Sequence, residues 1–478
     1  MKNKSVYILL SIVLFSIIMH LKGITSPLLD FHAWRQTQTA MIARNYYENG
    51  FKFFNPQVDW YGQESNKRAG TEFPVFSFII ALLYKMFGMH DILGRFLAVF
   101  FSAMSSVYLF LLLRKYFEFW YAYISTLIFI ILPINIYFTR TVQPESIMLF
   151  SIISGLYYFI NYLENPSKIL QLIFSFVLLT IAPLVKLPSL YVLLPIGFLA
   201  YNKWGWKVIY RIEIWLFNIF LVSNVFLWYR FAKTGMDVLP LKINDYIYML
   251  KILGQPKFWI MHFLSRFVEL TTTYAGLLFF IIGFWFIVLK KHLYFFGVWF
   301  ISVVIYIIAI GEYGYIHQYT ALPYAPINAV FIGGGIVYAW NKYSLVKINK
   351  ILLILLIISI PLHSLLRIRN WYKLSDLWLL NAKEDVSRIS EKNDLFLCNS
   401  KTIPIQLYHI DRKGFSIDIL KSDLNEVKYL IKKDMSFFLT ANDKRWSDDN
   451  EIGKYFIKNY KVVCENEDYK IFDLRKKI

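Results

Sequence analysis

The chain has 478 residues, of which 57% are hydrophobic, 19% aromatic and only 17% charged. A soluble surface needs about a quarter of its residues charged, so the composition excludes a soluble globular protein. The 2 Cys, 21 Gly and 15 Pro also exclude a disulfide scaffold, a collagen and a disordered chain. The sequence therefore predicts a polytopic membrane protein.

The formal net charge of +19 resembles that of a nucleic-acid-binding protein, but its distribution argues against that class. Residues 1–366 hold 29 Lys and Arg against 14 Asp and Glu, whereas residues 367–478 hold 22 against 18. The excess lies mainly among apolar segments, where it indicates membrane topology. We expect no nucleic-acid partner.

Eleven apolar segments are candidates for helices that cross the bilayer, which takes about 20 residues each. The first follows Met1-Lys2-Asn3-Lys4 without a small-x-small cleavage site, so we expect an uncleaved anchor. The candidates are residues 6–21, 92–113, 119–138, 146–162, 169–185, 188–201, 212–231, 274–289, 293–311, 320–340 and 350–366. The segment 74–88 is shorter and carries Lys85; it either spans or lies along the interface as an amphipathic helix.

The positive-inside rule decides between these alternatives. If 74–88 lies flat, the basic residues between spans fall in the cytoplasmic segments, which are 1–5, 114–118, 163–168, 202–211, 290–292 and 341–350. If it spans, every later basic cluster moves outside. We therefore expect a cytoplasmic N-terminus, with residues 22–91, 139–145, 232–273, 312–319 and the C-terminal tail outside the cytoplasm.

The tail, residues 367–478, has a different character from the 1–366 membrane domain. Its apolar runs shorten to strand length at 395–398, 436–439 and 461–464, and charged stretches of helical period such as 418–433 separate them. This pattern predicts a small α/β domain on the outer face. Cys398 and Cys464 both fall in it; an outer compartment permits a disulfide, but two buried strand cysteines are the favoured interpretation.

The first outer loop, residues 22–91, is too polar for a simple connector. Asp30, His32, Arg35 and Gln36 lie within seven residues of one another, and Ala33 to Tyr47 has helical character. Asp30 is a candidate general base, and it is equally a candidate helix cap. Arg35, Gln36 and Arg44 favour the catalytic interpretation, because capping does not require them.

The same loop ends in a second acidic position. Glu72 follows Lys67 and Arg68 and precedes the segment 74–88. One interpretation is a helix start in which Thr71 or Glu72 caps and Pro74 occupies the first turn. The other is a second carboxylate that binds a divalent cation or orients a substrate.

Further ionisable residues stand at the outer ends of later spans, where they are costly and mark functional candidates. Arg140 and Glu145 flank a tight turn and either pair with each other or serve a site. Lys186 lies alone between two spans and either binds an anionic headgroup or extends to the interface. His317 and Tyr319 lie in a short outer loop, and the longer loop 232–273, which contains Lys242 and Asp245, is a candidate lid.

These residues come from separate segments, yet the predicted topology places them all on one face of the membrane. Carboxylates beside basic groups at an outer interface suit chemistry on a lipid with an anionic head.

At these residues the chain resembles a known family. DFHAWRQTQTAMIARN at 30–45, TEFP at 71–74, RTVQPE at 140–145, LVKLP at 184–188 and HQYTALPYAPINA at 317–329 are similar to motifs of the GT-C membrane glycosyltransferases. The similarity is greatest to the branch of the lipid A aminoarabinose transferases and protein O-mannosyltransferases. It covers roughly residues 1–366, and the order of the motifs is more specific than any one of them.

The resemblance implies an inverting glycosyltransferase that moves a sugar from a polyprenyl phosphate to an envelope glycan, lipid or protein on the outer face of the inner membrane. It implies that Asp30 is the catalytic carboxylate and Glu145 the second acidic position, near the donor phosphate. It further implies that Glu72 binds a metal or the donor, and that Arg35, Arg140, Lys186, His317 and Tyr319 bind the donor. A divalent metal ion is the one candidate cofactor.

Two rival functions come from other classes. A transporter or flippase for lipid-linked glycans should carry charges or broken helices near the bilayer midplane, whereas here the charges cluster at the outer ends of clean spans. A receptor or assembly factor would need far fewer than eleven spans for anchorage. The sequence favours the enzyme, while the sugar and the acceptor stay open.

Overall fold

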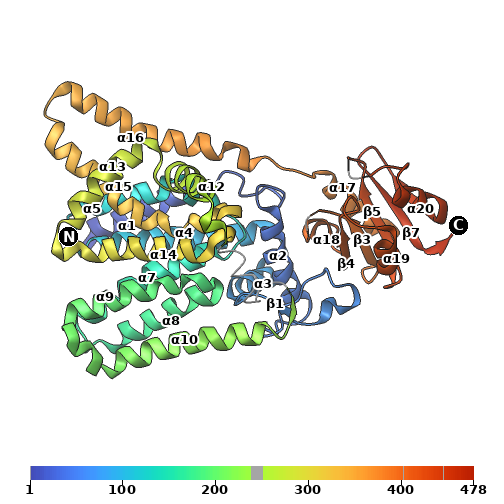
Figure 1. The fold of residues 1–478 in the computed structure, drawn as a ribbon, viewed down its shortest axis with the longest axis horizontal. Coiled ribbons are helices and arrows are strands. Elements are labelled where there is room, and N and C mark those ends of the chain that lie inside the picture. Colours follow the sequence, from blue (N-terminus) through green and yellow to red (C-terminus); the bar gives the residue numbers. More distant parts are fainter. Residues whose placement is uncertain (1, 238–250, 402, 445) are drawn as a thin grey trace. The chain divides into compact units, whose positions relative to one another are not determined.

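A computed structural model gives the fold and describes residues 2–237, 251–401, 403–444 and 446–478. Most described residues are helical, and a five-stranded sheet lies near the C-terminus (Figure 1). The predicted fold class, mainly α with a small C-terminal α/β domain, is therefore confirmed. The chain divides into two compact units: unit 1 comprises residues 1–24, 95–233 and 239–371, and unit 2 comprises 25–94, 234–238 and 372–478. Unit 2 thus contains most of the first outer loop as well as the tail, whereas the predicted boundary at 366/367 stays a prediction.

Unit 1 is helical throughout its described residues. Its helices are α1 (Lys2–His20), α4 (Asp91–Leu113, which starts in unit 2), α5 (Phe119–Ile131), α6 (Pro133–Phe138), α7 (Glu145–Glu164), α8 (Ile169–Val185), α9 (Leu193–Trp204), α10 (Ile212–Ala232), α12 (Pro256–Met261), α13 (Tyr274–Val288), α14 (Tyr294–Ile316), α15 (Tyr324–Tyr343) and α16 (Lys347–Ile368). Every predicted span falls on one or two of these helices.

Among the described residues, five helical segments are long and apolar enough to cross a membrane: 91–113, 145–164, 212–232, 291–316 and 347–372. A sixth is possible if the helices 256–272 and 274–288, bent by 88°, form one broken span. Shorter apolar helices cover 6–20, 75–87, 119–131 and 169–185. The count of eleven spans stays a prediction.

Two boundaries differ from the predicted ones for identifiable reasons. The segment 119–138 is broken between α5 and α6, where Leu132 is extended and Pro133 starts the second helix, as expected of the residue before a proline. Helical structure in α14 extends to Ile316, beyond the predicted end at 311, but Gly311 has a non-helical backbone with φ of 46°, so two helices meet there at a kink. Of the predicted lid 232–273, Lys242 and Asp245 lie outside the described residues, and residues 256–272 are helical.

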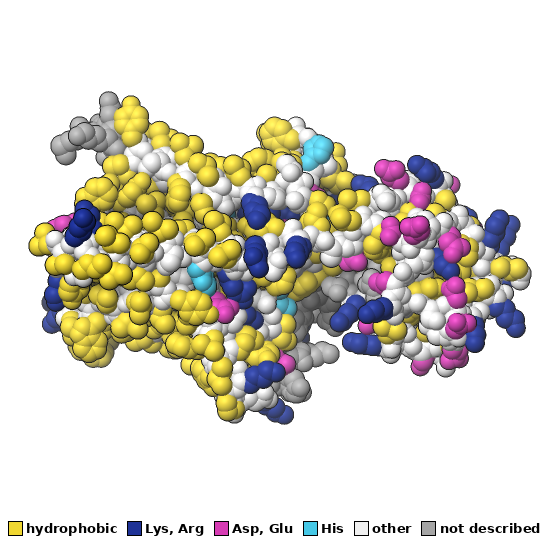
Figure 2. Space-filling view, turned by 90° about the horizontal axis from the view of Figure 1, so that it is seen from above, with side chains coloured by type: hydrophobic (Ala, Val, Ile, Leu, Met, Phe, Trp, Pro, Cys, Tyr) yellow, Lys and Arg dark blue, Asp and Glu magenta, His cyan; other side chains and the backbone are white. Residues whose placement is uncertain are grey.

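Large apolar side chains are exposed along the helices of unit 1, as a lipid-facing surface requires. On α10, for example, Ile219, Phe220 and Phe226 are all more than half exposed. In Figure 2 hydrophobic side chains cover the helices of unit 1, whereas charged side chains are dense on the tail. Together with its apolar helices, this surface makes the chain a multi-pass membrane protein.

The tail forms a sheet in the order β4-β3-β5-β7-β6. Its strands are β3 (Leu395–Asn399), β4 (Gly414–Ile417), β5 (Met435–Ala441), β6 (Tyr460–Glu465) and β7 (Tyr469–Lys477), and its helices are α17 (Trp378–Ile389), α18 (Ile405–Ile410), α19 (Leu424–Ile431) and α20 (Glu451–Asn459). The strands β4, β3 and β5 are parallel, and β7 runs antiparallel to β5 and β6. Residues of α19 and α20, including Val427 and Phe456, pack with Leu397 and Phe438 in one core, while Tyr469 and Cys464 contact Asp385 of α17.

The three predicted strands are confirmed as β3, β5 and β6. Cys398 lies buried on β3 and Cys464 partly buried on β6, and both thiols are free. The favoured interpretation of two buried strand cysteines is therefore confirmed for Cys398, whereas Cys464 lies on a strand but is only partly buried.

A run of glycines lets α15 pack closely against two neighbouring helices in unit 1. A Cβ atom at Gly335 would lie 1.9 Å from the backbone oxygen of Phe279 on α13, and one at Gly334 would lie 1.9 Å from the hydroxyl of Tyr121 on α5. Small residues permit such contacts between membrane helices, where close packing supplies the stabilisation. The sequence Gly333-Gly334-Gly335 therefore sets how closely these helices approach.

We predict that Gly335→Ala lowers the melting temperature of the detergent-solubilised protein by several degrees, because the new methyl group must displace the α13 backbone. The matched control is Gly197→Ala on α9, where nothing lies within 4 Å of the new atom. That variant should be neutral or slightly stabilising, since alanine favours a helix by about 1 kcal/mol over glycine. Equal melting temperatures for the two variants would contradict this packing.

Candidate functional site

The Asp30 carboxylate lies at the start of helix α2 (Ala33–Glu48) in unit 2. The residue that precedes the helix is His32, in a left-handed conformation with φ of 60°, so Asp30 does not occupy the capping position. The Oδ1 atom of Asp30 accepts a hydrogen bond of 2.6 Å from Nε2 of Gln36. Asp30 is only 3% exposed. A buried carboxylate whose position is fixed by a hydrogen bond at the start of a helix is a candidate general base.

Arg35 and Glu72, predicted separately, form one ion pair. The Nη2 atom of Arg35 donates to both carboxylate oxygens of Glu72, and its Nη1 atom donates to Gln38 at 3.1 Å. Helix α3 (Val75–Phe87) begins later than predicted: its N-cap is Pro74, whereas the sequence suggested Thr71 or Glu72 as the cap and Pro74 in the first turn. The carboxylate of Glu72 thus neutralises the buried guanidinium of Arg35. We call Asp30, Arg35, Gln36 and Glu72 the outer-loop cluster.

The second half of α2 carries the buried cation Arg44, whose partners the sequence analysis did not predict. Arg44 donates to Asp59 Oδ2 at 2.7 Å and pairs with Asp411 Oδ1 at 2.8 Å. Burial by itself lowers the pKa of Arg44. The negative charges of Asp59 and Asp411 outweigh that effect, so the pKa of Arg44 is raised above its usual value. Asp411 shows the converse: burial opposes its charge, yet Arg44 and Lys392 hold its pKa below the usual value. Arg44 and Asp411 therefore stay ionised at neutral pH.

Four predicted residues of unit 1 lie together around a lysine. Lys186 Nζ lies 2.9 Å from Glu145 Oε1, and these side chains are 13% and 2% exposed. The ammonium also lies 5.3 Å from the ring centroid of Tyr319, and His317 stacks on that ring at 5.3 Å. The Tyr319 hydroxyl lies 2.6 Å from that of Tyr313. We call Glu145, Lys186, His317 and Tyr319 the lysine cluster.

Arg140 is buried in unit 1 with other partners. Its Nη1 atom donates to the backbone oxygen of Gly23 at 2.9 Å, and its guanidinium lies 4.9 Å from the ring centroid of Tyr137. The predicted pairing partner Glu145 is bound to Lys186. Arg140 thus joins the end of the first helix to the turn that precedes α7.

The residues present do not fit the divalent metal ion that the resemblance implies. Among the described residues there is no group of three or more His, Cys, Asp or Glu that could hold a metal ion. The carboxylates of Glu72 and Glu145 are each engaged by a basic side chain. We derive no step through a metal.

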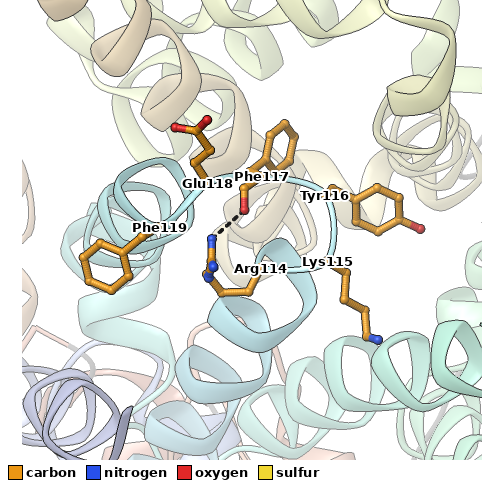
Figure 3. A pocket seen from close by; sticks show the side chains of 6 residues that line it. All are labelled: Arg114, Lys115, Tyr116, Phe117, Glu118 and Phe119. Carbon is orange, nitrogen blue, oxygen red and sulfur yellow. Dashed lines mark hydrogen bonds between the residues drawn. The ribbon is translucent and has the colours of Figure 1, made fainter. Parts of the chain in front are cut away.

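A hollow of about 440 Å³ lies elsewhere in unit 1, at the turn between α4 and α5 (Figure 3). It is lined by residues 114–119, and Nη1 of Arg114 donates to the backbone oxygen of Phe117 at 2.8 Å across its mouth. None of the predicted site residues lines it. Its Arg114 and Lys115 belong to a predicted cytoplasmic segment.

Known proteins are similar to this chain in two ways: a family model matches part of its sequence, and solved structures share its fold. A family model described as dolichyl-phosphate-mannose-protein mannosyltransferase matches residues 70–229. Among curated proteins, none matches significantly. The crystal structure of ArnT from Cupriavidus metallidurans bound to undecaprenyl phosphate is similar with a TM-score of 0.63 at 9% identity, covering 97% of each chain. The oligosaccharyltransferase AglB from Archaeoglobus fulgidus, in complex with an inhibitory peptide and a dolichol-phosphate, has a TM-score of 0.58 at 10% identity, covering 98% of this chain and 74% of that one.

The buried pair of Glu145 and Lys186 generates a prediction about stability. Lys186→Met should leave a buried carboxylate without its counter-charge, which costs about 3–5 kcal/mol, and should lower the melting temperature in detergent. Glu145→Gln combined with Lys186→Met should cost less than the sum of the single changes.

The matched control is the exposed pair of Glu64 and Lys67, whose side chains are 54% and 62% exposed. An ion pair between solvent-exposed side chains contributes little to stability, so Lys67→Met should leave the melting temperature nearly unchanged. Additive effects at positions 145 and 186 would show that the two charges do not interact.

Proposed function

We propose that this chain is a GT-C membrane glycosyltransferase that transfers a sugar from a polyprenyl-phosphate donor to an envelope acceptor. The family model that matches residues 70–229 and the fold similarity to ArnT and AglB support this proposal. The acceptor is a glycolipid, a polysaccharide or a protein, and transfer takes place on the outer face of the cytoplasmic membrane. The observation that carries the proposal is the buried carboxylate of Asp30, held by Gln36 at the start of a polar helix.

The class of donor is supported by the similar structures. ArnT is bound to undecaprenyl phosphate and AglB to a dolichol-phosphate, and both of these lipids are polyprenyl phosphates. The exposed apolar side chains on the helices of unit 1 suit a partner with a long hydrocarbon chain. In this proposal the lipid stays in the bilayer while its phosphate and sugar reach the polar residues.

Asp30 acts as the general base in this proposal. Its carboxylate takes the proton from an acceptor hydroxyl or amine, and the acceptor oxygen or nitrogen forms a bond to the anomeric carbon. The bond between that carbon and the phosphate oxygen breaks, and polyprenyl phosphate leaves. A single displacement without an enzyme nucleophile inverts the anomeric centre. The groups that would stabilise the charge on the leaving phosphate are Lys186, Arg140 and His317.

Glu145 and Glu72 have supporting roles in this proposal. Glu145 fixes Lys186 through their 2.9 Å ion pair and so holds an ammonium ready for an anionic phosphate. The ammonium also lies over the ring of Tyr319. The negative face of an aromatic ring stabilises a nearby cation. Glu72 holds Arg35 in the first turn of α2, next to Gln36. In this proposal each glutamate therefore holds a basic side chain in position: Glu145 holds Lys186, and Glu72 holds Arg35.

We predict that Asp30→Asn reduces consumption of the donor by about 10²–10⁴-fold, because it removes a positioned general base. The measurement incubates purified protein with a panel of polyprenyl-phosphate sugars and an envelope extract, and follows loss of each donor. Asp449→Asn, at an exposed position of the tail, is the control and should retain turnover. Wild-type rates in Asp30→Asn would remove Asp30 from the mechanism. If folded wild-type protein consumed no donor, the transporter function would be favoured.

The orientation in the membrane is tested independently by cysteine labelling. Glu64, exposed in the first outer loop, and Leu345, 92% exposed between α15 and α16, are replaced singly by cysteine in a Cys464→Ser background. We predict that a membrane-impermeant maleimide added to intact cells labels position 64 and does not label position 345 until the cells are opened. Labelling of both positions in intact cells would contradict the topology.

A further inference from the structure

A buried histidine joins the end of helix α1 to the turn that precedes α7, and all of the residues involved belong to unit 1. His20 is the last residue of α1 and is completely buried. Its Nε2 atom lies 2.9 Å from the hydroxyl of Thr139, and that hydroxyl lies 2.8 Å from the hydroxyl of Ser102 on α4. Three segments of the chain thus meet at the residue before Arg140.

The hydrogen-bond roles of the His20 ring follow from its second nitrogen. Nδ1 lies 2.5 Å from the backbone oxygen of Ser16, and a carbonyl oxygen only accepts, so Nδ1 carries the proton. In the neutral ring Nε2 then accepts, and the hydroxyls of Thr139 and Ser102, 2.9 and 3.4 Å away, can donate to it. The backbone oxygen of Asn135 lies 3.3 Å from the same atom. The ring is therefore held by its own helix at Nδ1 and contacts the turn at Nε2.

We propose that His20 is a positioning residue for Arg140, which it holds in place through Thr139. The inference rests on the proposed role of Arg140 in stabilising the charge of a polyprenyl phosphate. Consecutive Cα atoms are about 3.8 Å apart, so a fixed Thr139 fixes the point from which the Arg140 side chain departs. The guanidinium returns to the same end of α1, where its Nη1 atom donates to the backbone oxygen of Gly23 at 2.9 Å.

The position of Arg140 matters because its side chain is wholly buried. A charge in the protein interior is screened less than one in water, so its attraction for an anion is stronger and changes more steeply with distance. A small displacement of the turn therefore changes the attraction that a phosphate experiences. It leaves the contacts of the hydrocarbon chain of the same lipid unchanged. The affinity for the phosphate, compared with that for the chain, thus separates positioning from a merely structural role.

Hydrogen–deuterium exchange of the full chain in detergent tests the contact between His20 and Thr139 without a ligand. We expect His20→Ala and the nearly isosteric Thr139→Val to accelerate exchange in peptides that cover residues 137–145, because each removes one partner of the 2.9 Å contact. His20→Gln, whose amide oxygen can accept in place of Nε2, and Thr139→Ser, which keeps the hydroxyl, should restore protection.

The matched control for exchange is Tyr121→Phe. It removes another buried bond between helices, the 3.0 Å bond from the Tyr121 hydroxyl on α5 to the backbone oxygen of Val330 on α15, and leaves the contact of His20 intact. Unchanged exchange at 137–145 in the folded His20 and Thr139 variants, or an equal increase there in Tyr121→Phe, would overturn the inference.

Lipid binding supplies the second measurement, with undecaprenyl phosphate as the charged probe and undecaprenol as its uncharged counterpart. We expect His20→Ala and Thr139→Val to raise the Kd of undecaprenyl phosphate about tenfold and to leave the Kd of undecaprenol unchanged. His20→Gln and Thr139→Ser should recover most of the loss. A merely structural role would weaken the binding of both lipids equally or of neither, which would overturn the inference.

A double variant shows whether the effect acts through Arg140. Arg140→Gln alone should also weaken the binding of undecaprenyl phosphate, and adding Thr139→Val should weaken it little further, because both changes act on one guanidinium. Independent losses that multiply in the double variant would overturn the inference. Wild-type protein that binds both lipids with equal affinity would refute the proposed function, and the exchange comparison would still decide whether His20 holds the turn.

Discussion

Burial of the polar helix α2 is the constraint on which unit 2 depends. Thirteen of its sixteen residues are buried, including Arg35 and Arg44. A buried charge without a partner costs several kcal/mol, so each guanidinium requires a carboxylate from elsewhere in the chain. Glu72 supplies one, and Asp59 and Asp411 supply the other. Glu72 and Asp59 lie on the outer loop and Asp411 lies on the tail. Pairing the two guanidinium groups therefore holds helix α2, the rest of the outer loop and the tail together in one unit, with Asp30 just before the start of α2.

The lysine cluster of unit 1 follows the same rule at the ends of membrane helices. Ionisable groups there persist only when they are paired, and Lys186 is held by Glu145 on one side and by the Tyr319 ring on another. Each partner comes from a different turn between helices. Such a cation is fixed in place before any anion arrives, which is the preorganisation that stabilises a leaving phosphate.

The sequence was sufficient for the helices and for three strands, because apolar run length and period are local properties. Asp30, Glu145 and Lys186 could be singled out as candidates because ionisable residues at the ends of apolar segments are rare, and their roles stay predictions. The sequence could not predict that Glu145 binds Lys186 rather than Arg140, because both cations are equally plausible until the turns are placed in space. The pairing of Arg44 with Asp411 was inaccessible for the same reason: it joins residues that are remote in the chain. Two strands were missed: β4 has only four residues, and in β7 the apolar and charged residues mix without a clear run.

The anomeric configuration of the product tests the central claim most directly. The protein would be given a polyprenyl-phosphate sugar of known configuration with its acceptor, and the product would be examined by NMR. The proposed single displacement with Asp30 as the base predicts release of polyprenyl phosphate and a new glycosidic bond of inverted configuration. A bond of retained configuration would require an enzyme nucleophile and contradict the mechanism, whereas a donor moved intact across the bilayer would contradict sugar transfer altogether.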